Sequence, residues 1–300
     1  MFLGGNLMGG LHPENYFKPK TPAEVVSILH RYKEDALIMG GGTEIYELSE
    51  RGFLTSVKAV VDLSNLGLDK IRERDGEVLL GASVTLSQLE RQRELYAGGA
   101  LGCLPDALRD LGPLQVRNMA TVAGAVTACI PFFDLPVALA CLNTVIEVQG
   151  DGGKIRRVPI LTFQRDYLQP DLNEGEFVAG LVVPKQEDGT KSAFTKFVSN
   201  AGDWSIVNCA SAIRVTRGKV SSAKVVFGAV ANKPFVAERA AAALVGTRLD
   251  DAALESAGGA LDEELVDPTS DGKASGAYRK RLAKILLKET VRKAASRRGG

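Results

Sequence analysis

Three consecutive glycines interrupt the segment "IMGGGTEIYE", which runs from Ile38 to Glu47. Glycine loses about 0.5–1 kcal/mol more backbone entropy on folding than alanine, so the run indicates a backbone that takes positive φ or approaches another group closely. Successive N–H groups in such a turn can form a concave site for an anion, commonly phosphate, and Thr43 adds a hydroxyl donor. A tight strand-to-helix turn without a ligand is the alternative.

The glycine spacing excludes two common nucleotide sites. Gly40, Gly41 and Gly42 lack the G-x-G-x-x-G spacing of dinucleotide-binding folds. No Gly-Lys-Ser/Thr follows them, as it would in a Walker loop. A second segment must therefore decide whether this turn binds a ligand.

Small residues gather again in the segment "RNMATVAGAVTACIPFFD", from Arg117 to Asp134. A loop of such residues could enclose the other side of a diphosphate, and the Asp134 carboxylate could accept hydrogen bonds from ribose hydroxyls. By composition alone, close approach of a packed helix is the simpler explanation. The small members of the segment are Ala120, Thr121, Ala123, Gly124 and Ala125.

Side chains for other kinds of catalysis are scarce. The two histidines, His12 and His30, leave little for a histidine-based metal site or a Ser-His-Asp triad. The four cysteines, at positions 103, 129, 141 and 209, form no CxxC pair. They argue for reduced thiols in a cytosolic protein and against a zinc site or iron–sulfur cluster held by this chain alone. We predict no catalytic acid or base and no metal site.

The composition is that of an ordinary globular protein. The chain has 300 residues, of which 45% are hydrophobic and 24% charged, and its formal net charge is +1. This charge gives no reason to expect binding to nucleic acid or to an anionic membrane. The longest apolar stretch is interrupted by Pro131, Asp134 and Pro136, so we expect no membrane span. The N-terminus makes a poor signal peptide, and we predict a cytoplasmic protein.

The elements that must position these segments follow from capping and periodicity. Thr21 and Glu24 predict a helix over residues 21–32 that begins with a capping box. A strand should lead into the glycine run, and another should follow at residues 57–64. The remaining predicted elements are a hairpin around Asp75-Gly76, helices over residues 85–95, up to Gly112 and from about Leu135, and strands near residues 144–148 and 174–184.

The pattern changes at the polar segment "KQEDGTKS", where we place a domain boundary. Beyond it, three strands with turns at "RGK" and "ANKP" precede several helices, an order typical of a separate α+β unit. The last helix carries basic residues from Lys280 to Arg292 around an apolar stripe; it either packs on its own domain or docks to a partner. We predict a first domain over residues 1–185, with lobes of about 1–60 and 61–185, and a second over 190–300.

Together, the two small-residue segments resemble those of the FAD-binding medium subunit, or FAD domain, of the xanthine dehydrogenase and carbon monoxide dehydrogenase family of molybdenum hydroxylases. That family has an "AGGT(D/E)L"-like loop, then "R-N-x-A-T-(I/V)-G-G-N" and "SP-x-x-D". The counterparts are Gly40 to Ile45, Arg117 to Ala125 and Ile130 to Asp134. The resemblance implies an α+β fold, with a two-lobed FAD-binding domain of the vanillyl-alcohol-oxidase/PCMH type and a C-terminal domain of antiparallel sheet plus helix bundle.

The resemblance also implies non-covalently bound FAD and the residues that bind it. Ile38 to Ile45 would form the first diphosphate loop, Ala120 to Gly124 the second, and Asp134 would bind the ribose or ribityl region. Leu111 and Lys196 fall where the family contacts its cofactor. The implied set is Ile38, Met39, Gly40, Gly41, Gly42, Thr43, Glu44, Ile45, Leu111, Ala120, Thr121, Ala123, Gly124, Asp134 and Lys196.

The function implied by the resemblance is electron transfer in a multi-subunit molybdenum hydroxylase. Electrons would pass from iron–sulfur clusters of a partner subunit through FAD to an external acceptor. The clusters and the molybdopterin would belong to a two-iron–two-sulfur small subunit and a molybdopterin large subunit, in a dimer of heterotrimers. FAD would perform the redox step. One alternative is a stand-alone NAD(P)H-dependent flavin reductase of the same fold.

This sequence departs from the family pattern at a few positions. Ala123 stands where glycine is usual and Ala125 where asparagine is usual. These changes suggest a second alternative, a non-catalytic scaffold subunit that has lost FAD. Phe132 and Phe133 are bulky where the family often has small residues; they either flank the flavin ring or pack in the core.

Overall fold

The structure is a computed structural model that describes residues 11–200 and 202–297. Its first lobe is a parallel sheet in the order β1-β3-β2. The Thr21 hydroxyl accepts from the Glu24 N–H and starts α1, but the Glu24 carboxylate accepts from the Lys20 N–H, so the predicted capping box is only half formed. The elements are β1 Asn15–Phe17, α1 Pro22–Tyr32, η1 Lys33–Asp35, β2 Ala36–Met39, α2 Thr43–Glu50, β3 Ala59–Asp62 and η2 Leu63–Leu66.

The second lobe is built on an antiparallel sheet in the order β4-β5-β10-β6-β7. The predicted hairpin is present, and both of its turn residues, Asp75 and Gly76, have positive φ, as a two-residue turn between twisted strands requires. The strands are β4 Ile71–Arg74, β5 Glu77–Gly81, β6 Val145–Gln149, β7 Ile155–Pro159, β8 Gln164–Asp166, β9 Gln169–Pro170 and β10 Phe177–Val183, with a short helix η3 Asp151–Gly153.

Short helices connect the strands of this lobe, and two predictions about them are wrong. The expected helix over residues 85–95 is split, because Gln92 leaves helical geometry and the Tyr96 hydroxyl donates to the Leu89 carbonyl. The helix expected to end at Gly112 ends at Arg109. The helices are α3 Leu86–Glu90, α4 Arg93–Tyr96, α5 Cys103–Arg109, α6 Leu114–Met119, α7 Val122–Thr127, α8 Asp134–Cys141 and α9 Ile160–Phe163.

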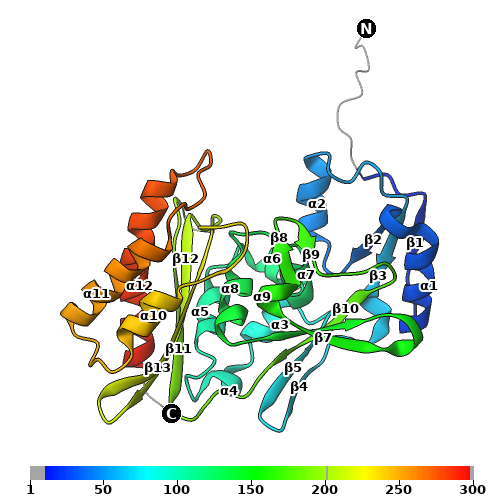
Figure 1. Ribbon diagram of the computed structural model, residues 1–300. Coiled ribbons are helices and arrows are strands. Elements are labelled where there is room, and N and C mark those ends of the chain that lie inside the picture. Colours follow the sequence, from blue (N-terminus) through cyan, green and yellow to red (C-terminus); the bar gives the residue numbers. More distant parts are fainter. Residues whose placement is uncertain (1–10, 201, 298–300) are drawn as a thin grey trace.

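The C-terminal domain is an antiparallel sheet in the order β11-β12-β13-β14 with helices on both faces. Figure 1 shows α10, α11 and α12 on its outer face and α5 and α8 between it and the rest of the molecule. Every residue of α8 is buried, and those after Asp134 are all apolar, as expected for a helix that is covered on all sides. The elements are β11 Thr190–Phe197, β12 Val207–Thr216, β13 Lys219–Gly228, β14 Phe235–Val236, α10 Glu238–Leu244, α11 Asp251–Glu264 and α12 Gly276–Ser296.

Three basic residues of the last helix, α12, form ion pairs with its neighbour α11. The Lys284 Nζ atom lies 2.5 Å from Asp262 Oδ2. Lys288 pairs with Glu255, and Arg292 pairs with Asp251. This face therefore packs within its own domain. The predicted α+β class is confirmed, and the four cysteines are buried and unpaired. Within the described residues, no helix combines the length and the apolar character needed to cross a bilayer.

Candidate functional site

The glycine run joins β2 to α2 and packs directly against the second small-residue segment. A Cβ on Gly41 would lie 1.8 Å from the carbonyl oxygen of Met119, so only glycine fits there. Gly42 is the N-cap of α2 and has a φ of +73°, a conformation that glycine adopts without strain. The run is thus required by a close approach and a turn. It leaves the N-terminus of α2 without a capping side chain.

The second segment is mostly helical, which corrects the prediction of a loop. Its small residues lie at the junction of α6 and α7, where Ala120 and Thr121 form the turn. The Thr121 hydroxyl accepts from the Gly124 N–H at 3.1 Å and caps α7. The Ala120 carbonyl and the Val122 N–H bond to Leu86 and Val84. This turn is therefore held by its own cap and by the chain that follows β5.

Arg117 fixes the other end of this segment. Its Nε donates to Glu90 at 3.1 Å, and its Nη1 donates to the Gly112 carbonyl at 2.7 Å. These contacts tie α6 to α3 and to the turn before α6. Arg117 is therefore a structural residue of this segment.

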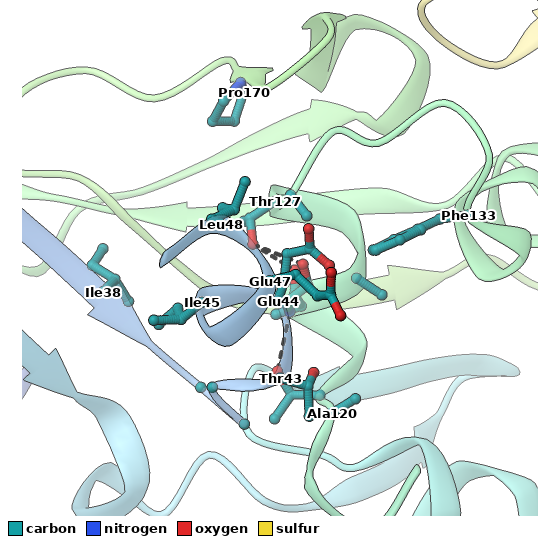
Figure 2. A pocket seen from close by; sticks show the side chains of 18 of the residues that line it. Ile38, Thr43, Glu44, Ile45, Glu47, Leu48, Ala120, Thr127, Phe133 and Pro170 are labelled. Atoms are coloured by element: carbon teal, nitrogen blue, oxygen red, sulfur yellow. Dashed lines mark hydrogen bonds between the residues drawn. The ribbon is translucent and has the colours of Figure 1, made fainter. Parts of the chain in front are cut away.

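The two segments form part of the wall of one cavity of about 1190 Å³. All of the predicted cofactor-binding residues except Met39 line it; Met39 instead packs with Leu54, Val57 and Val60. In Figure 2, Glu44 and Glu47 extend from α2 into this cavity. The structure therefore brings together residues that are distant in the sequence, from Ile38 to Lys196.

Asp134 and Lys196 meet at the wall of the cavity. The Lys196 ammonium donates to Asp134 Oδ2 at 2.8 Å and to the Asp110 carbonyl at 2.7 Å. Asp134 Oδ1 accepts from Ser205 at 2.6 Å and from Asn208 at 2.8 Å. The side chains of Asp134 and Lys196 are only 6% and 11% exposed. Both carboxylate oxygens thus already have partners from the C-terminal domain, so Asp134 joins the two domains.

Trp204 is a cavity residue that the sequence analysis missed. Its ring stacks on Phe132 with a centroid distance of 4.7 Å and an interplanar angle of 23°. The Arg51 guanidinium, just after α2, lies 5.4 Å from the Trp204 ring centroid, within cation–π range. Trp204 thus contacts both lobes of the first domain. It is the one tryptophan of the chain, but nothing in its spacing indicated this position.

Glu44 has an unusual electrostatic environment within the cavity. Burial is the main cause that raises its pKa to about 7, and the negative charge of Glu47 adds to the rise while Arg51 opposes it. A carboxyl group with this pKa is partly protonated near neutral pH. Glu44 can therefore donate or accept a hydrogen bond there, depending on pH.

Comparison with known families accounts for both halves of the chain. A family described as "FAD binding domain in molybdopterin dehydrogenase" matches residues 10–186. The chain belongs to this family of molybdenum hydroxylase FAD-binding subunits. A second family, "CO dehydrogenase flavoprotein C-terminal domain", matches residues 192–294 of this FAD-binding subunit.

The FAD-binding subunit is similar over nearly its whole length to medium chains of two dehydrogenases. It is 30% identical to the carbon monoxide dehydrogenase medium chain of Afipia carboxidovorans, over 94% of this chain and 97% of that one. It is 32% identical to the glyceraldehyde dehydrogenase medium chain of Sulfolobus acidocaldarius, over 94% and 98%. A solved structure of reconstituted CO dehydrogenase from Oligotropha carboxidovorans superimposes with a TM-score of 0.89 at 28% identity, covering 96% of this chain and 99% of that one.

The cavity fits FAD in size and chemistry. Its volume of about 1190 Å³ exceeds the range of about 300–1,000 Å³ that is usual for drug-sized ligands, as a dinucleotide needs. The uncapped N-terminus of α2 at its wall suits an anionic diphosphate. Apolar side chains such as Ile38, Ile45 and Leu111 also line the cavity. The residues present therefore agree with the cofactor of the family.

Proposed function

We propose that the chain is the FAD-carrying electron-transfer subunit of a multi-subunit molybdenum hydroxylase. It receives electrons from iron–sulfur clusters of a partner subunit and passes them through FAD to an external acceptor. The relatives named as medium chains of dehydrogenases support this proposal. The observation that carries it is that the start of α2 and the α6–α7 turn line a single cavity of dinucleotide size.

The start of α2 is the proposed seat of the FAD diphosphate. The first N–H groups of a helix have no intrahelical partner, and the helix dipole favours negative charge there. Gly42 provides no side chain that would occupy these groups, and Thr43 can add its hydroxyl. Beside it, the proposed second contact surface consists of Ala120, Thr121, Ala123 and Gly124.

The remaining wall would orient the rest of the cofactor. Leu111 and Phe133 line the cavity and offer the apolar surface that a flavin ring requires. The Asp134–Lys196 pair keeps the two domains in register at this wall, and Lys196 stays a predicted cofactor contact. When bound, FAD supplies the one- and two-electron redox chemistry. The side chains bind it, orient it and exclude water, and no acid–base residue of the chain is needed.

The proposed partners are a two-iron–two-sulfur small subunit and a molybdopterin large subunit, in a dimer of heterotrimers. They would supply the substrate chemistry and the iron–sulfur clusters.

We also propose that the chain folds as domains over residues 1–185 and 190–300, the first with lobes of about 1–60 and 61–185. Family matches that end at residue 186 and begin at residue 192 support a division between them.

A flavin titration and a reduction assay test the proposed function. The full-length chain, freed of flavin, is titrated with FAD while flavin fluorescence and visible absorbance are recorded. The FAD-loaded chain is then mixed anaerobically with the chemically reduced two-iron–two-sulfur subunit. We expect saturable FAD binding and bleaching of the flavin band by the reduced partner.

Two outcomes would contradict the proposed function. Absence of FAD binding under both oxidising and reducing conditions would remove the flavoprotein assignment. Rapid turnover of NAD(P)H by the FAD-loaded chain alone, without bleaching by the reduced iron–sulfur partner, would indicate a stand-alone flavin reductase.

A further inference from the structure

Most carboxylates that line the cavity have a cation beside them. The ion pairs are Asp134–Lys196, Glu174–Lys33, Glu176–Arg156, Asp203–Lys273 and Glu47–Arg51. Of the other two lining carboxylates, Glu34 is exposed to solvent, whereas Glu44 is half-buried. Among the described residues, no basic group forms an ion pair with Glu44. Glu44 is thus the cavity carboxylate whose negative charge is least compensated.

The neighbouring elements do not supply the missing positive charge. Thr127 of α7 and Phe133 line the same cavity as Glu44 (Figure 2). The helix α7, Val122–Thr127, carries no titratable side chain. On its own helix, Glu47 raises the pKa of Glu44, and Arg51 only partly offsets this effect. The charged residues that line the cavity from other elements form the ion pairs given above, except the exposed Glu34.

Glu44 also lies next to the proposed seat of the diphosphate. It is the second residue of α2, directly after Thr43 and two positions after the Gly42 cap. An anion held by the first N–H groups of α2 would therefore lie close to this side chain. A negative Glu44 would repel that anion, whereas a neutral Glu44 would not, and its O–H could donate a hydrogen bond.

We propose that Glu44 is neutral when FAD is bound, so that binding of the dianionic diphosphate is coupled to uptake of one proton by this carboxyl group. This inference rests on the proposed function. The proton comes from solvent and goes to a carboxylate oxygen of Glu44, and no electron is transferred in this step. FAD itself does not change charge between pH 6 and 8.5, so the coupling resides in the protein.

The direction of the pH dependence follows from linkage. The pKa of Glu44 is about 7 without ligand, and a nearby anion raises it further. The affinity of the chain for FAD is therefore highest below pH 7. It falls as the pH rises from 7 to the pKa that Glu44 has when FAD is bound. Each unit by which the ligand raises the pKa weakens the binding at high pH by about tenfold.

The test is the dissociation constant of FAD for the full-length chain between pH 6 and 8.5. We expect it to rise by about tenfold across this range, and calorimetry in two buffers of different ionisation enthalpy should show net proton uptake near pH 7. Glu44→Gln should give a dissociation constant that does not vary with pH. Glu50→Gln, an exposed position on the same helix, should keep the full pH dependence.

A third variant sharpens the test. Glu47→Gln removes a negative charge that raises the pKa of Glu44, so it should move the midpoint of the pH dependence to lower pH. Saturable FAD binding with no pH dependence, or the same dependence in Glu44→Gln, would overturn the inference and leave the proposed function intact. Failure of the chain to bind FAD at any pH would overturn both.

Discussion

The two segments that meet at Gly41 and Met119 have opposite local architectures. The first ends in a glycine cap and leaves the start of α2 without a capping side chain. The second caps its own helix, because the Thr121 hydroxyl is bonded to the Gly124 N–H, and it continues into α8, which the C-terminal domain holds through Asp134. The first segment is therefore suited to bind an anion, and the second to brace the first.

Substitution of Asp134 tests whether the second segment stabilises the first, and we expect the largest loss of stability there. Asp134→Asn would leave the buried Lys196 without its counter-ion, and removal of one partner of a buried pair typically lowers stability by about 3–5 kcal/mol. Chemical denaturation should show this loss in the free energy of unfolding. Since both domains meet here, FAD affinity should fall as well.

Asp203→Asn is the matched control for this substitution. Asp203 also pairs with a lysine, Lys273, but that pair is much more exposed, and exposed pairs contribute about 0–1 kcal/mol. Equal losses of stability in the two variants would show that Asp134 does not hold the domains together. The second segment would then not stabilise the first through Asp134.

The contact between the segments can be broken at Gly41. Gly41→Ala places a methyl group 1.8 Å from the Met119 carbonyl oxygen, so one segment must move. Overpacking of this kind costs about 1–3 kcal/mol, and we expect FAD affinity to fall by about tenfold or more because the start of α2 is displaced. Thermal unfolding and FAD titration measure the two effects.

The control for the added methyl group is Gly98→Ala. A Cβ at Gly98 has no atom within 4 Å, so stability and FAD affinity should stay unchanged. If Gly41→Ala behaved in the same way, the two segments would not be in the tight contact described above, and the glycine run would need another explanation.

The sequence predicted the glycine turn well because its causes are local. Positive φ and close approach act on single residues such as Gly41 and Gly42, and glycine is the residue type that tolerates both. The second segment is harder to predict, because a run of small residues is compatible with either a ligand-binding loop or a packed helix junction. Lys196, Ser205 and Asn208 reach Asp134 across 62, 71 and 74 positions. Sequence spacing cannot predict such contacts, because tertiary packing alone determines them.

The cap of the second segment offers a smaller test. Thr121→Ala removes the side chain that accepts from the Gly124 N–H, and loss of a threonine cap typically lowers the free energy of unfolding by about 1 kcal/mol. Thr121→Ser should restore most of it. A loss of FAD affinity of about 100-fold with unchanged stability would instead mean that this hydroxyl contacts the diphosphate. The second segment would then be a binding surface equal to the first.

The smallest expected effect concerns Ala125, which lines the cavity at the position where the family usually has asparagine. Ala125→Asn adds an amide that could bond to FAD, and one hydrogen bond contributes about 0.5–1.5 kcal/mol, so we expect FAD to bind about two- to tenfold more tightly. If the first segment already holds the diphosphate, the gain must stay within this range. A change from no detectable binding to tight binding would mean that the second segment controls FAD binding and that the natural chain is a scaffold without FAD.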